Sequence, residues 1–262
     1  MPDVPFFKNC FNTRVMYSTI HVNDAFKNGF RTFKGNAYRD YTTVYGSIIK
    51  LVEYNENLLC VFEHGIALIS VNERALAAQG SNGNVYINTS NVLPENPMII
   101  SDTFGSQWSE SIIKTDRGVY GVDTIAKKIW MFNGKLQCIS DFSIQEFLNN
   151  NITLTERELT PTIGIRNVKT HYNKYKNDVM FTFYDNLYDF EEKSWNLCWN
   201  ELLQKWITFY SWLPSYSENI YNQYFSFDRT TSKWISKLGS SNANSSFADG
   251  VVLDNNIFED YC

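Results

Sequence analysis

The chain has 262 residues, of which 44% are hydrophobic, 19% charged and 16% aromatic, and its formal net charge is −5. No window approaches the roughly 18 consecutive apolar residues of a membrane-spanning helix, and the first residues lack the basic-then-apolar order of a signal peptide, so we expect a soluble protein with no membrane partner. The 28 acidic residues outnumber the 23 basic ones, which argues against a protein that grips nucleic-acid phosphates by charge.

The first hundred residues predict short strands separated by turns. Apolar or alternating runs begin at Gly46, Asn57, Ile66 and Asn84, and read GSIIKLVEYNE, NLLCVFEHG, IALISVNE and NVYINTS. Runs of this length bounded by polar turn residues are typical of antiparallel strands.

The clearest strand pattern lies between Ser111 and Ser140. The runs SIIKT, VYGVDT, KKIWMF and KLQCIS follow one another with short connections, which predicts four antiparallel strands in thirty residues. The dipeptide Asn133-Gly134 separates the last two runs and predicts a type I′ hairpin turn, with positive φ at both central residues.

One segment, DFSIQEFLNNN, predicts a short helix over residues 143–149. We expect Ser143 to cap its N-terminus, with Glu146 three residues on, and the asparagine run to end it. This helix divides the chain into three predicted parts. They are a strand-rich region at 1–142, the helix with an Asn-rich connection at 143–151, and a second strand-rich region at 152–262. If the fold is a β-propeller, the two strand-rich regions form its first and its further blades.

The second strand-rich region repeats the pattern of short strands. The runs IGIRNVKTHY, DVMFTFYD, WNLCWN, KWITFYSW, NQYFSFD and KWISKLG are separated by polar turns such as NKYKN, ELLQ and RTTS. Strands spaced about ten residues apart predict an all-β fold of antiparallel hairpins, arranged as a sandwich, barrel or propeller.

An internal repeat favours propeller blades over a generic sandwich. In each copy an Asx residue ends one strand, a tight polar connection follows, and a lysine and a tryptophan open the next strand, at 123–130, 200–206 and 228–234. The Asx side chain can hold the turn by bonding its own backbone, while the indole enters the core. Hairpins recurring on one plan are typical of successive blades, so we expect Trp130, Trp206 and Trp234 to be equivalent buried residues.

Cysteines and histidines are too scattered to suggest a site. Neighbouring cysteines lie 50 to 78 residues apart, at Cys10, Cys60, Cys138, Cys198 and Cys262, so free thiols in a reducing compartment are favoured over disulfides or a zinc site. Each histidine, at 21, 64 and 171, lacks neighbouring ligands, which favours ordinary polar positions over metal ligation. We therefore predict no metal and no cofactor.

A catalytic interpretation would have to use carboxylates. The densest group comprises Asp178, Asp185, Asp189, Glu191 and Glu192, in which two members could form an acid and base pair. A solvated hairpin turn is the favoured interpretation of the residues from Asp185 onward. Phosphate-binding loops, nucleophile elbows and HExxH patterns are absent from the sequence, so we predict no catalytic residues and no enzyme.

Aromatic residues crowd the segment from Trp195 to Phe227 and suggest a contact surface. Exposed Trp and Tyr side chains are common platforms for protein partners and for sugar rings, although core packing is favoured by the burial tendency of aromatics. The candidate interface or glycan-contact residues are Trp195, Trp199, Trp212, Tyr216, Tyr221 and Tyr224.

The stretch from Gly105 to Leu148 resembles the tail nozzle proteins of short-tailed bacteriophages, in particular the muzzle family of the crAss-like group. The family pattern has a glycine-serine start, a serine-rich approach, a Gly-Val-Tyr strand pair, an Ile-Trp strand and an Ile-Ser step into a short helix. The segment from Asn200 to Pro214 is similar to a blade hairpin of the same proteins. The matching positions are Gly105, Ser109, Ser111, Gly118, Val119, Tyr120, Asp123, Ile129, Trp130, Ile139, Ser140 and Phe147.

This resemblance, over roughly residues 14 to 238, implies a virion structural protein without catalytic residues. It implies a β-propeller that decorates a ring of identical subunits around the DNA exit channel of the tail. Its partners would be copies of itself and other tail proteins, with genomic DNA only passing through, and assembly would take place in the host bacterial cytoplasm. Complete muzzle subunits are several times longer, so the chain would be a fragment, a blade-bearing segment or a separately encoded relative. A glycan-binding propeller or tail adhesin is the alternative.

Overall fold

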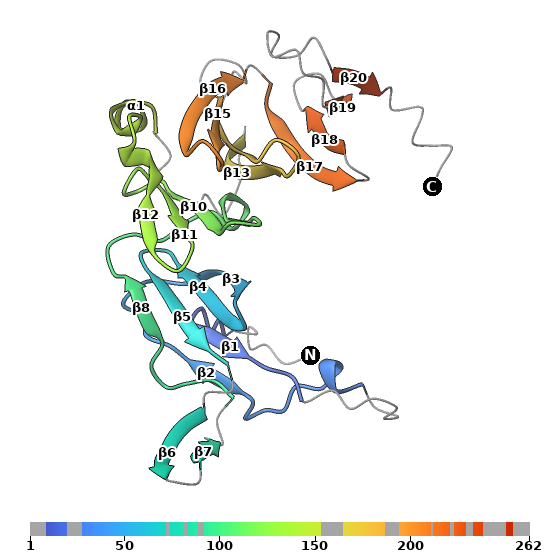
Figure 1. Cartoon of the computed structure of the whole chain (residues 1–262). Coiled ribbons are helices and arrows are strands. Elements are labelled where there is room, and N and C mark those ends of the chain that lie inside the picture. The colour runs from blue at the N-terminus through green and yellow to red at the C-terminus, as the bar shows by residue number, and fades with distance from the viewer. Residues whose placement is uncertain are drawn as a thin grey trace, which may run out of the picture. The chain divides into compact units, whose positions relative to one another are not determined.

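A computed structural model describes residues 9–19, 28–71, 74–80, 83–88, 92–152, 165–186, 194–210, 212–220, 223–228, 233–237 and 250–253. The chain forms two compact units, Met1–Gly105 and Ser106–Cys262, each of which is described by itself (Figure 1). Both units consist mainly of antiparallel sheets, which confirms the predicted all-β class. The short helical segments are η1 (Gly29–Arg31), η2 (Ser109–Ser111), η3 (Ile139–Asp141) and α1 (Gln145–Asn151).

The first unit is built on a four-stranded sheet in the order β3-β4-β5-β8, with two strand pairs, β1-β2 and β6-β7. Its core contains Phe62 and Ile69 from the middle strands of that sheet. Asn55 and Glu56 join β3 to β4 with positive φ at both residues, 46° and 64°, as a type I′ turn requires. The strands are β1 (Arg14–Met16), β2 (Tyr38–Asp40), β3 (Ile48–Tyr54), β4 (Asn57–Phe62), β5 (Ile66–Ser70), β6 (Arg74–Gly80), β7 (Gly83–Asn88) and β8 (Met98–Ser101).

The second unit contains three four-stranded sheets, and in each one consecutive strands pair antiparallel in chain order. The first sheet comprises β9 (Ile113–Lys114), β10 (Val119–Asp123), β11 (Lys128–Phe132) and β12 (Leu136–Cys138). The middle sheet comprises β13 (Ile165–Asn173), β14 (Asp178–Asn186), β15 (Trp195–Asn200) and β16 (Lys205–Tyr210). The last sheet comprises β17 (Pro214–Ile220), β18 (Gln223–Asp228), β19 (Lys233–Lys237) and β20 (Gly250–Leu253).

The middle sheet is packed on both faces. Alternate side chains of β14, such as Val179 and Phe181, join a core with Tyr120 and Ile129 of the first sheet. On the opposite face Met180 of the same strand packs with residues of the last sheet and its approach, among them Trp212 and Tyr224. Because side chains alternate along a strand, one sheet can serve two cores.

Three hairpins of the second unit share one Asx-held loop of four residues. The side-chain oxygen of Asp123 accepts two backbone N–H bonds at 2.9 Å from residues two and three positions on. The side-chain oxygens of Asn173 and Asn200 accept from the equivalent positions at 2.9 to 3.3 Å. The last loop residue is left-handed in every case, with φ of 53° at Lys127, 55° at Asn177 and 49° at Gln204. The predicted turn role of the Asx residues at 123 and 200 is confirmed.

The Asn133-Gly134 turn differs from the prediction. Phe132 pairs with Leu136, so the loop has three residues, and only Gly134 has a positive φ, of 98°. Three-residue hairpin loops place a glycine in the left-handed region, which accounts for Gly134.

The helix forms close to the predicted place, but Ser143 does not cap it. Helix α1 begins at Gln145, no side chain caps it, and Ser143 donates to the adjacent carbonyl of Phe142 instead. The positive φ of Ser143, 72°, is incompatible with the extended backbone of a capping residue. Leu148 is part of the core of the second unit, which begins at Ser106.

The three repeat tryptophans are not equivalent. Trp130 is fully buried, and a Cβ on its cross-strand partner Gly121 would clash with the indole. Trp206 is only partly buried, because β16 is an edge strand of the middle sheet. The side chain of Trp234 lies outside the described part of the chain, although its strand pairs with β18 and β20.

We expect Trp130→Ala to destabilise the protein more than Trp206→Ala. Removing a fully buried indole typically costs about 3 to 5 kcal/mol, whereas a partly buried one on an edge strand gives up less contact area. Thermal and urea unfolding of both variants would measure the difference. Equal losses in the two variants would contradict the unequal burial.

A buried histidine joins the middle and last sheets. Nδ1 of His171 lies 2.9 Å from Oγ of Ser217, and the side-chain amide of Asn219 donates to the carbonyl of Tyr172 at 2.8 Å. Burial lowers the pKa of His171 from 6.5 to about 4, although the nearby carbonyl of Pro214 acts in the opposite direction. The charged neighbours are Lys169, which also lowers this pKa, and Glu110, which raises it.

The lowered pKa of His171 predicts that acid decreases the stability of the fold. Because the folded-state pKa is lowered, the unfolded chain binds the proton more readily, so the free energy of unfolding falls as the pH drops from about 6.5 to about 4. The loss is on the order of 3 kcal/mol. We expect His171→Gln to lose less stability than the parent across that range in urea unfolding. Parallel pH profiles for the two proteins would refute the prediction.

Candidate functional site: a hollow between two sheets

Three of the six predicted aromatic contact residues are buried. Trp199, Trp212 and Tyr224 are buried, and Trp195 is partly buried with its ring stacked on Phe183 at 3.9 Å. Tyr216 is 54% exposed, and Tyr221 lies outside the described residues. Core packing, the alternative favoured by aromatic burial, thus accounts for three of the six, while a contact role remains a prediction for the exposed Tyr216.

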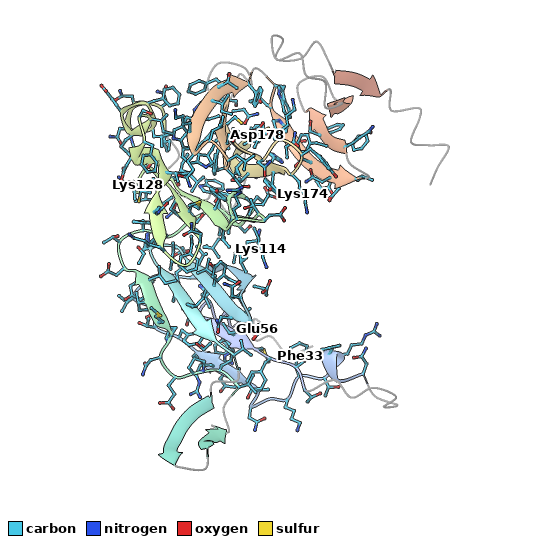
Figure 2. All side chains as sticks on the ribbon, in the orientation of Figure 1. Phe33, Glu56, Lys114, Lys128, Lys174 and Asp178 are labelled. Atoms are coloured by element: carbon cyan, nitrogen blue, oxygen red, sulfur yellow. The ribbon has the colours of Figure 1, made fainter. Side chains whose placement is uncertain are left out.

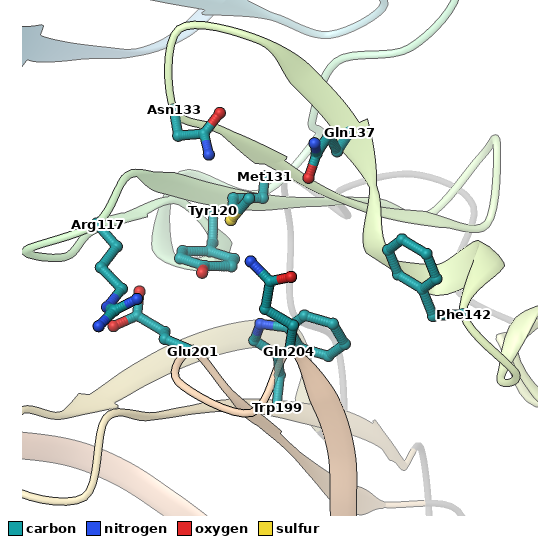
Figure 3. Close-up of a pocket in the computed structure, with 9 residues that line it drawn as sticks. All are labelled: Arg117, Tyr120, Met131, Asn133, Gln137, Phe142, Trp199, Glu201 and Gln204. Atoms are coloured by element: carbon teal, nitrogen blue, oxygen red, sulfur yellow. The ribbon is translucent and has the colours of Figure 1, made fainter.

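A hollow of about 440 Å³ lies between the first and middle sheets of the second unit (Figure 3). Its floor consists of buried side chains from β10, β11, β15 and the β15–β16 loop. They are Tyr120, Met131, Trp199 and Glu201. The floor is therefore largely apolar, with one carboxylate.

The rim of this inter-sheet hollow is polar and comes from connecting segments. Figure 3 shows the amides of Asn133, Gln137 and Gln204 directed toward the space between the sheets, and Arg117 also lines the rim. Phe142 completes the rim, 54% exposed, with its ring stacked on Trp199 at 6.1 Å and an interplanar angle of 20°. All five rim side chains are exposed, so they are accessible to a ligand.

Glu201 is the most constrained member of the hollow. Its backbone N–H donates to the carbonyl of Asn177 at 2.8 Å, and Oε1 accepts from Oγ1 of Thr115 at 2.5 Å. Oε2 is buried and has no hydrogen-bond partner within the described residues. A buried carboxylate oxygen without a donor carries a desolvation cost, which a donor from a ligand or water would offset.

Two tyrosines surround this carboxylate. Burial raises the pKa of Tyr120 and of Tyr172, and the negative charge of Glu201 raises both further. Both phenols therefore stay protonated at neutral pH. They can donate hydrogen bonds but cannot act as bases.

Other chemistry proposed from the sequence is not assembled in the described part of the chain. Within it, no three His, Cys, Asp or Glu side chains are grouped as a metal site. Asp178 is buried and accepts from the amide of Asn200 at 2.7 Å, while the side chains of Asp185, Asp189, Glu191 and Glu192 lie outside it. Burial raises the pKa of the Cys60 thiol to about 12, so this cysteine is a poor nucleophile.

Sequence reasoning missed the hollow. Of its lining residues only Trp199 was a predicted contact residue, and Tyr120 appeared only among the positions of the family resemblance. The others come from turns, from β11 and from β12, and no local pattern marks them. No helix among the described residues is long and apolar enough to span a membrane.

Antiparallel sheets, most of them four-stranded, define this chain as an all-β protein. The family model described as crassvirus muzzle protein matches residues 4–230, so the chain belongs to the crassvirus muzzle protein family. A curated muzzle protein of Bacteroides phage crAss001 is 26% identical over 168 residues. That alignment covers 64% of this chain and 11% of the relative, and the resemblance found in the sequence is confirmed.

Proposed function

We propose that the chain is a non-enzymatic structural segment of a phage tail muzzle. The family match over residues 4–230 carries the proposal. A segment is proposed because the alignment covers only 11% of the crAss001 muzzle protein. In this proposal the protein is located in the virion tail and is assembled in the host bacterial cytoplasm.

The architecture we propose is a β-propeller. Three consecutive sheets are four-stranded antiparallel meanders, as propeller blades are, and the middle one packs its faces against both neighbours. Its first strand, β13, also contacts the first strands of both neighbouring sheets, β9 and β17. First strands that gather side by side are what blades around a central axis require.

Contacts with copies of itself in a ring and with other tail proteins are proposed to use β16 and β17. These strands expose apolar side chains of the kind enriched where proteins meet. The exposed residues are Ile207, Phe209, Tyr216 and Ile220.

Genomic DNA is proposed to pass such a ring without being held. Each free lysine or arginine near a phosphate strengthens attachment by counterion release. The one basic pair of the sequence is engaged: Nζ of Lys127 donates to the carbonyl of Asn149, and Nζ of Lys128 pairs with Asp141, each at 2.6 Å. Lys128 is labelled in Figure 2. Lys174 likewise pairs with Asp116 at 3.3 Å.

Cryo-electron microscopy of purified virions tests the structural role. We expect stacked four-stranded sheets with this sequence in the tail, arranged as a ring. Particles whose tails lack the chain would overturn the proposal.

Duplex DNA binding tests the passive role. We expect no salt-sensitive binding by filter assay at about 50 mM salt, where even a few phosphate contacts strengthen attachment measurably. Lys127→Ala and Lys128→Ala should leave this result unchanged. Tight binding that either substitution weakens would contradict a conduit that does not hold DNA.

A further inference from the structure

We propose that the inter-sheet hollow binds one neutral sugar ring, which adds a glycan-binding site to the structural role. Its volume of about 440 Å³ falls within the usual range of small-molecule sites, and its composition of apolar floor and polar rim is typical of them. The ligand class follows from three features of the hollow: an unpaired buried acceptor, a neutral charge balance and an exposed aromatic ring.

The unpaired acceptor is Oε2 of Glu201. Thr115 bonds the other carboxylate oxygen, and the buried Oε2 makes no hydrogen bond of good geometry among the described residues, although the phenols of Tyr120 and Tyr172 lie near the carboxylate. Pairing this atom would offset the cost of its desolvation. A hydroxyl group is a suitable donor because it brings no charge into the hollow.

Charge and hydrogen-bonding capacity favour a neutral ligand with several hydroxyls. Glu201 opposes an anion, and Arg117, which lines the same hollow, opposes a cation. The three rim amides, of Asn133, Gln137 and Gln204, each offer two donors and one acceptor oxygen. Sugar hydroxyls likewise donate and accept, so adjacent hydroxyls can satisfy both functions of one amide.

Phe142 supplies a flat apolar surface. It is more than half exposed, and its ring stacks on the buried Trp199. An ordered aromatic ring beside polar side chains matches a sugar ring, whose C–H groups are apolar and whose hydroxyls are polar. A hydrocarbon ligand would leave the carboxylate unpaired, and water would leave this ring exposed.

The test is binding of glucose, galactose, mannose and N-acetylglucosamine to the full 262-residue chain, measured by saturation-transfer NMR and calorimetry. We expect at least one sugar to bind with a dissociation constant of about 1 mM or tighter. Phe142→Ala and Gln137→Ala, both at exposed positions, should each weaken binding at least tenfold. Phe33→Ala, at a phenylalanine of similar exposure that does not line the hollow, should leave it unchanged.

Glu201→Gln keeps the shape of the side chain and tests the acceptor. We expect weaker sugar binding while unfolding stays cooperative. The proposal is overturned if none of the four sugars binds at tens of millimolar concentration, well above the expected dissociation constant, or if binding persists in both Phe142→Ala and Gln137→Ala. Either result would leave the structural role in the tail intact, because that role is tested by the composition of the virion.

Discussion

Strand β14 is buried on both of its faces, and the arrangement of the second unit depends on this constraint. Every residue from Asp178 to Tyr184 is buried. The polar members must therefore find partners inside the protein: Thr182 donates to Asn196 at 3.2 Å, and the hydroxyl of Tyr184 donates to the carbonyl of Pro214 at 2.5 Å. One strand thus fixes both the stacking of its sheet on the first sheet and the seating of the last sheet.

The two interfaces of the middle sheet are stabilised by different kinds of interaction. The interface with the first sheet is a large apolar core, so its stabilisation grows with the area removed from water and is not directional. The interface with the last sheet has a smaller apolar cluster and relies on directional bonds such as those of His171 and Asn219. The inter-sheet hollow lies at this apolar interface. There the β15–β16 loop places the carboxylate of Glu201 next to the apolar core side chains.

The sequence predicted the hairpins well because their signals are local. An Asx residue followed by a polar loop specifies a turn through bonds within six residues, as at Asp123 and Asn200. Strand β17 was missed because PSYSENI has little apolar alternation, and its polar side chains are bonded to β13, 46 residues away at Ser217. The hollow was missed for the same reason: its residues meet only through the pairing of distant strands.

The repeat tryptophans show where local reasoning ends. The Asx-lysine pair at the turn recurs in register, with Asp123 opposite Lys128 and Asn200 opposite Lys205, but the first hairpin joins the second and third strands of its sheet and the other joins the third and fourth. Trp130 therefore has a strand on each side, whereas Trp206 lies on an edge. The repeated motif therefore marks loops of one type and does not mark successive blades. The burial of each indole depends on which strands pair, and a pattern of six residues does not contain that information.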